Sequence, residues 1–93
     1  MKEPITKSSG NVFTDLGFSK EEAAVYSMRS QLMARIRETI KENDWTQTDA
    51  AEHLDIAQSR VSDLVRGKQD KFSLDMLVTL ASRAGRTMEL AIA

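Results

Sequence analysis

Four polar residues at the start of a short amphipathic segment have side chains that can recognise the edges of DNA bases. They are Gln58, Ser59, Arg60 and Ser62. A glutamine carboxamide can pair with adenine through two hydrogen bonds, an arginine guanidinium can pair with guanine in the same way, and a serine hydroxyl suits several bases or a phosphate. We therefore predict that these four residues contact base edges in a major groove.

Basic residues follow the same segment and have the charge that contacts phosphate. Arg66, Lys68 and Lys71 are predicted to bind the DNA backbone, which positions a protein on the duplex without reading its sequence. Lys71 has an equal alternative as an ordinary surface charge. Arg60 has a competing interpretation as the partner of Asp63, because residues three apart on a helix can form a solvated ion pair.

The stretch Thr46–Lys68 has the spacing of two short helices that meet across a tight turn. Its inward positions are expected to be Ala50, Ala51, Leu54, Ile56, Val61, Leu64 and Val65. This spacing predicts helices from about Gln47 to Leu54 and from about Gln58 to Arg66. The polar residues of the second helix then face outward, with its N-terminal end placed to enter a major groove.

Capping residues mark the ends of these two helices. Thr46 is a favourable N-cap, and Trp45 is placed to pack against Ala50 as a hydrophobic staple. Asp55 occupies the turn, where it can adopt a left-handed backbone conformation. Gly67 supplies a C-terminal cap. The two helices are therefore expected to be well delimited by local sequence.

A long helix is predicted before this motif and a shorter one after it. Ser19 and Glu22 match a capping box, and an apolar stripe follows that ends near Asn43. The stripe consists of Val25, Met28, Leu32, Ile36 and Ile40. A break near Ser27 could divide this helix in two, and Ser73 caps the last helix. The basic residues on the outer side of the long helix are expected to form a solvated face, with a partner-binding face as the alternative: Arg29, Arg35, Arg37 and Lys41.

The last residues, Arg86 to Ala93, alternate between apolar and other side chains, which is the period of a strand. Met88, Leu90 and Ile92 share one side. A strand must pair, and the only candidate within the chain is Asn11 to Thr14, so we favour pairing with the same segment of a second copy. The alternative is a tail that lays the three apolar residues on the core.

Composition restricts the classes of protein that remain. The chain of 93 residues predicts one domain, residues 11–93, after a flexible tail, residues 1–10. Its net charge of −1 argues against nonspecific coating of nucleic acid, and the absence of cysteine excludes disulfides and thiolate metal sites. No apolar run approaches the roughly 20 residues of a membrane span, and no signal peptide is evident. We expect a cytoplasmic protein without contact to membranes.

Catalysis has little support in this sequence. His53 is the single histidine, has no cysteine near it, and lies among acidic residues on a predicted helix surface. The sequence also contains no glycine-rich loop that would cradle a phosphate. We therefore expect a protein that is not an enzyme and that carries no metal and no cofactor.

Nearly the whole chain after the tail resembles one family of small regulators. The most specific matches are Thr46-Gln47, the run from Gln58 to Gly67, and the sequence Phe72-Ser73-Leu74-Asp75. These features are similar to those of XRE/Cro-type helix-turn-helix regulators that serve as HigA-like antitoxins of toxin–antitoxin pairs. Ala57 stands where this family usually has a serine cap, and Asp55 stands where it usually has glycine.

The resemblance implies a mainly α, lambda-repressor-like bundle of about five helices, with a short C-terminal β-strand that pairs across a homodimer. It implies a repressor of its own promoter that binds a palindromic double-stranded DNA operator and holds a small toxin. Thr46 and Gln47 would then contact the DNA backbone. Two alternatives remain open: a solitary phage or chromosomal regulator without a toxin, and a protein-binding module that keeps the helix-turn-helix as a scaffold.

Overall fold

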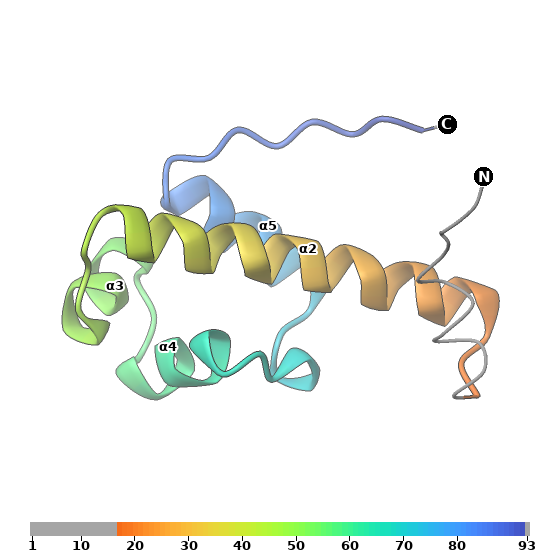
Figure 1. Cartoon of the computed structure of the whole chain (residues 1–93), viewed down its shortest axis with the longest axis horizontal. Coiled ribbons are helices and arrows are strands. Elements are labelled where there is room, and N and C mark those ends of the chain that lie inside the picture. The colour runs from red at the N-terminus through yellow and green to blue at the C-terminus, as the bar shows by residue number, and fades with distance from the viewer. Residues whose placement is uncertain (1–16, 93) are drawn as a thin grey trace.

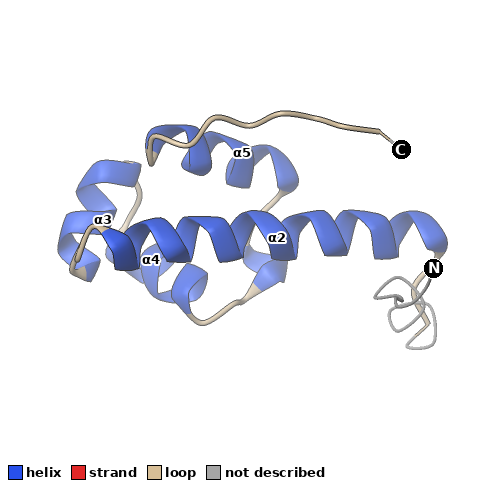
Figure 2. Ribbon diagram, turned by 45° about the horizontal axis from the view of Figure 1, so that its top comes forward, coloured by secondary structure: helices blue, strands red, loops and turns tan. Residues whose placement is uncertain are grey.

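The fold is built almost entirely from helices around one long helix. The structure is a computed structural model and describes residues 17–92. Its helices are α2 (Lys20–Glu42), α3 (Gln47–Leu54), α4 (Gln58–Val65) and α5 (Leu74–Arg83), with a 3-10 turn, η1 (Gln69–Lys71), before α5. Figure 1 shows α4 and α5 on opposite sides of α2, with α3 near its C-terminal end. Figure 2 shows the same helical arrangement from a second direction.

Helix α2 is continuous, so the predicted long helix is confirmed and the possible break near Ser27 is absent. Its start is fixed by the predicted capping box: the Glu22 amide donates to Ser19 Oγ over 3.1 Å, and the Ser19 amide donates to Glu22 Oε1 over 2.9 Å. Ser27 lies within regular helix, where Gln31 Nε2 donates to its hydroxyl. A single serine among good helix formers costs too little to interrupt a helix. The described residues therefore form four α-helices and one 3-10 turn, rather than about five helices.

The core lies where α2 passes α3, α4 and α5. Its buried members are Leu32, Met33, Ile36, Ala50, Leu54, Val61, Leu64, Phe72, Leu77, Leu80 and Ala81. The apolar stripe of α2 is only partly covered, because Val25 is 43% exposed and Met28 is 40% exposed. Figure 1 shows the reason: the N-terminal turns of α2 extend beyond α4 and α5. Val65 was also expected inward but is 44% exposed, since it ends α4 at the edge of the core.

The C-terminal segment, residues 86–92, is extended but is not a strand in this single chain. A strand requires a neighbour, and the candidate within the chain, Asn11 to Thr14, lies outside the described residues. Leu90 is 76% exposed and Ile92 is 85% exposed, so these side chains do not cover the core. That exposure argues against a tail that lays Leu90 and Ile92 on the core, whereas Met88, at 42% exposed, lies beside α2 and α5. The predicted tail, residues 1–10, also lies outside the described residues.

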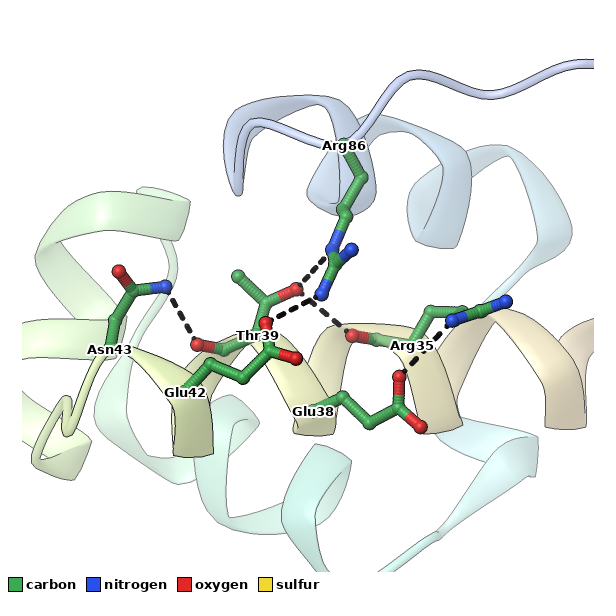
Figure 3. A network of polar contacts seen from close by, with 6 residues as sticks. All are labelled: Arg35, Glu38, Thr39, Glu42, Asn43 and Arg86. Carbon is green, nitrogen blue, oxygen red and sulfur yellow. Dashed lines mark hydrogen bonds and ion pairs between the residues drawn. The ribbon is translucent and has the colours of Figure 1, made fainter.

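One arginine holds the start of this segment against α2. Arg86 Nε donates to Thr39 Oγ1 over 2.6 Å, and Arg86 Nη2 lies 2.8 Å from Glu42 Oε1 (Figure 3). Thr39 is buried, and its hydroxyl in turn donates to the Arg35 carbonyl over 3.0 Å. These bonds hold Arg86 against α2 and so set the direction in which residues 86–92 leave the core. One of the bonded residues, Thr39, is buried.

Candidate nucleic-acid interface

Helices α3 and α4 form the predicted helix-turn-helix, and the turn between them depends on Asp55. Its backbone is left-handed, with φ of 57° and ψ of 50°. Glycine adopts this conformation without a steric penalty, and aspartate is among the few other residues that tolerate it. The Ile56 amide then donates to the Ala51 carbonyl over 3.1 Å. The turn geometry expected from the sequence is confirmed.

The start of α3 is capped as the sequence predicts. The Asp49 amide donates to Thr46 Oγ1, and the Thr46 amide donates to Asp49 Oδ2, both over 3.1 Å. The Thr46 hydroxyl oxygen thus accepts from the helix, while its O–H hydrogen is left for an acceptor such as a phosphate. Thr46 and Gln47 are both exposed, so both side chains are accessible for the predicted backbone contacts.

The start of α4 has no such cap. Ala57 is its N-cap residue and makes no side-chain hydrogen bond to the helix. Backbone amides at a helix start are unsatisfied unless a side chain, water or ligand accepts from them, and they attract anions such as phosphate. An alanine at this position therefore leaves the entry of α4 open to solvent or to a bound phosphate.

The four predicted base-reading residues are not equally available. Gln58 and Ser59 are exposed at the start of α4, whereas Arg60 and Ser62 are half-buried. The guanidinium carbon of Arg60 lies 4.9 Å from the centre of the Phe72 ring, and Phe72 is itself buried. Within residues 17–92 Arg60 forms no ion pair with Asp63, so that interpretation is wrong. Sequence reasoning missed the contact between Arg60 and Phe72, because the two residues belong to different elements separated by η1.

Thr48 is a second residue that sequence reasoning missed. The Gln58 Nε2 atom donates to Thr48 Oγ1 over 2.5 Å, and both side chains are exposed. This hydrogen bond links the first turn of α3 to the first residue of α4. Helical periodicity does not relate two residues that lie ten positions apart, so it does not indicate this contact. The turn of the helix-turn-helix brings the start of α3 close to the start of α4.

The predicted phosphate-contacting residues lie toward the two ends of α4. Thr46 and Gln47 lie at the start of α3, and the hydrogen bond between Thr48 and Gln58 joins that start to the first residue of α4. Arg66 and Lys68 are exposed beyond the last turn of α4. Lys71 is exposed in η1. Groups that can contact phosphate therefore flank both ends of α4, a helix of eight residues.

Arginines from outside the motif hold its helix ends in place. Arg83 Nη1 donates to the Leu54 carbonyl at the end of α3 over 2.9 Å, and Arg37 Nη1 donates to the Leu64 carbonyl near the end of α4 over 3.5 Å. Arg29 donates to the Gln69 and Phe72 carbonyls over 3.4 and 3.3 Å. The expectation of a solvated face is thus wrong for Arg29 and Arg37. It is confirmed for Arg35, whose exposed side chain pairs with Glu38 over 3.3 Å.

Trp45 packs locally, although its main ring contact was not anticipated. Its ring stacks on His53 with centroids 4.1 Å apart and planes 11° apart, and Trp45 also packs against the core that contains Ala50. The two residues lie just before α3 and in its last turn, so the stack braces α3 along its length. His53 is exposed and belongs to no group of three potential metal ligands among the described residues.

Comparison with known proteins agrees with this geometry. The family model described as a helix-turn-helix domain matches residues 12–93, which is most of the chain. A search of curated proteins found no match. None of the helices described here has both the length and the apolar character required to span a membrane.

Proposed function

Because the chain belongs to the helix-turn-helix domain family, we propose that it is a sequence-specific transcriptional repressor that binds a palindromic DNA operator as a homodimer. The observation that carries the proposal is the open start of α4, where Gln58 and Ser59 are exposed and no side chain caps the helix. In this role α4 enters the major groove by its N-terminal end, and its polar side chains contact base edges. The proposal assigns the chain no catalytic activity and no cofactor.

The structure supports different roles for the predicted contacts. In the proposal Gln58 and Ser59 read bases, and the exposure of both side chains supports this role. Arg60 reads a base only after its guanidinium leaves Phe72, or else it contacts a phosphate from that position. Arg66, Lys68 and Lys71 contribute backbone contacts that are insensitive to sequence.

Residues 86–92 supply the proposed dimer contact. Met88 is 42% exposed and lies beside an apolar hollow on α2 and α5 that includes Met28, Leu32 and Val78. Leu90 and Ile92 are more exposed still. Pairing of two such segments across a twofold axis would form a two-stranded sheet and bury these side chains. A dimer also presents two α4 helices, which matches the symmetry of a palindromic operator.

We further propose that the repressor is the antitoxin of a HigBA-like pair and controls its own promoter. The support is the resemblance of Thr46-Gln47, Gln58–Gly67 and Phe72–Asp75 to HigA-like antitoxins. The competing proposal is a solitary regulator, which would share each DNA-reading feature. A small basic reading frame beside the gene, whose product copurifies with this chain, would favour the antitoxin. Failure of that product to bind would favour the solitary regulator.

A reporter gene placed behind the DNA upstream of the coding sequence tests the repressor role. Expression of the chain should lower reporter output, and footprinting with the purified protein should protect two half-sites related by twofold symmetry. The matched control is Gln58→Ala, which removes an exposed side chain and should restore reporter output at equal protein level. Unchanged output with the wild-type chain, together with no footprint, would refute the proposal for that promoter.

A further inference from the structure

We propose that Thr48 is a specificity-positioning residue, which holds the Gln58 carboxamide in the place and plane from which it pairs with adenine. This inference rests on the proposed function and deepens it. Its basis is the 2.5 Å hydrogen bond from Gln58 Nε2 to Thr48 Oγ1. Thr48 is the second residue of α3 and Gln58 is the first residue of α4, so the bond crosses between the two helices of the motif.

The chemistry of a carboxamide explains why this contact matters. Pairing with adenine requires one amide hydrogen, which donates to N7, and the amide oxygen, which accepts from N6. The amide nitrogen carries two hydrogens, so donation of one to Thr48 leaves a second for another acceptor. In the proposal Thr48 takes the hydrogen remote from Oε1, and adenine takes the hydrogen on the edge that also carries Oε1.

The same contact restrains the position of the amide. Thr48 Oγ1 accepts a hydrogen bond from Gln58 Nε2, which holds the carboxamide beside the first turn of α3. A hydroxyl can both accept and donate, so this bond restricts the place and plane of the carboxamide, and adenine itself selects the arrangement with nitrogen toward N7. Because both side chains are exposed, bonding also limits the rotamers that Gln58 would otherwise sample before it reaches DNA.

The cap at the start of α3 does not use the Thr48 hydroxyl. The cap of α3 is formed by Thr46 and Asp49, whose reciprocal bonds do not involve Thr48. Thr48 itself is exposed and is not part of the core. A valine in its place keeps the branched shape and removes only the hydroxyl, so Thr48→Val separates positioning from folding.

The test is parallel selection of bound duplexes from a randomised DNA library with wild-type protein, Thr48→Val, Thr48→Ser and Gln58→Ala. Gln58→Ala identifies the base position that depends on Gln58, because the preference for adenine should disappear there. Thr48→Val should lower the preference for adenine at that position by about threefold to tenfold, the usual effect of one net hydrogen bond. Preferences elsewhere should be unchanged, and Thr48→Ser should restore the wild-type pattern. Circular dichroism melting of each variant controls for folding.

Three outcomes would overturn the inference while leaving a DNA-binding repressor intact. One is an unchanged adenine preference in Thr48→Val. Another is an equal loss of affinity for every sequence, which would make the hydroxyl a phosphate contact. The third is a Gln58→Ala variant with no altered position, since Gln58 would then read no base. If instead the wild-type protein enriches no sequence, the proposed function itself fails.

Discussion

At the scale of single residues, the first turn of α4 presents two polar side chains to solvent, Gln58 and Ser59, beside a face that packs into the core. The exposure of Gln58 and Ser59 follows from helical periodicity, because Val61 and Leu64 are buried and fix the inward face of α4. Periodicity says nothing about contacts between elements. The positions of Arg60 over Phe72 and of Gln58 against Thr48 therefore required the fold.

Lys68→Ala should weaken binding to all DNA alike. Lys68 is exposed just beyond α4, where it can neutralise a phosphate but has no predicted base contact. Loss of one phosphate contact should reduce the slope of log K against log salt concentration by about 1. Fluorescence anisotropy on an operator and on a random duplex, across a salt series, measures this. A loss confined to the operator would assign Lys68 to base reading instead.

At the scale of elements, local capping signals predicted helix starts well. Ser19, Thr46 and Ser73 each accept a hydrogen bond from the amide three residues later, as their sequence context indicates. The long helix predicted from the capping box and the apolar stripe is present, and the possible break near Ser27 is absent, since a weak local signal cannot outweigh packing along the rest of a helix. The arginine bonds to the ends of α3 and α4 were missed, because they join residues far apart in sequence.

Thr46→Ala should destabilise the protein by about 0.5–2 kcal/mol, the usual cost of removing a helix N-cap. The substitution removes the acceptor for the Asp49 amide, whereas Thr46→Ser keeps it and serves as the matched control. Urea unfolding of both variants and wild type provides the measurement. Equal stability of all three would mean that α3 does not depend on this cap.

Glu22 should titrate below its ordinary range in the folded protein. The Ser19 backbone amide and then the Ser19 hydroxyl lower the pKa of this carboxyl from its usual 4.5. A depressed folded-state pKa gives stability that is present above the unfolded pKa and is lost as pH falls through the folded one. The capping box should therefore weaken only below about pH 4.5. NMR titration of the Glu22 carboxyl should show this, and Ser19→Ala should raise its pKa. A carboxyl that titrates normally in the wild-type protein would contradict the capping box.

At the scale of the whole molecule, the sequence predicted a helical domain and favoured, for its C-terminal segment, a strand that pairs between copies over a tail on the core. Alternation in residues 86–92 indicates a strand, and the single chain offers no described partner for it. The exposed Leu90 and Ile92 agree better with an intermolecular contact than with a tail on the core. Pairing between copies depends on the surface of the folded chain around Leu90 and Ile92, which the alternation of side chains along the sequence does not describe.

Replacement of Leu90 and Ile92 by lysine should yield monomers with sharply reduced operator affinity. Two charges cannot be buried in a dimer contact without a large desolvation cost, whereas in a monomer both positions are exposed and the fold should be unaffected. The matched control is Val65→Lys, which adds charge at another exposed apolar site. Sedimentation equilibrium gives the mass of each variant. A double variant that stays dimeric would exclude pairing through this segment.

The central claim is that α4 reads DNA sequence through its exposed first turn, and the ratio of operator affinity to random-duplex affinity tests it most directly. For wild type, at physiological salt, this ratio should be at least about 10³. For Gln58→Ala, operator binding should weaken by about 1–3 kcal/mol while binding to random DNA stays unchanged. A wild-type ratio near one, or an equal loss on both duplexes in the variant, would contradict sequence reading by α4.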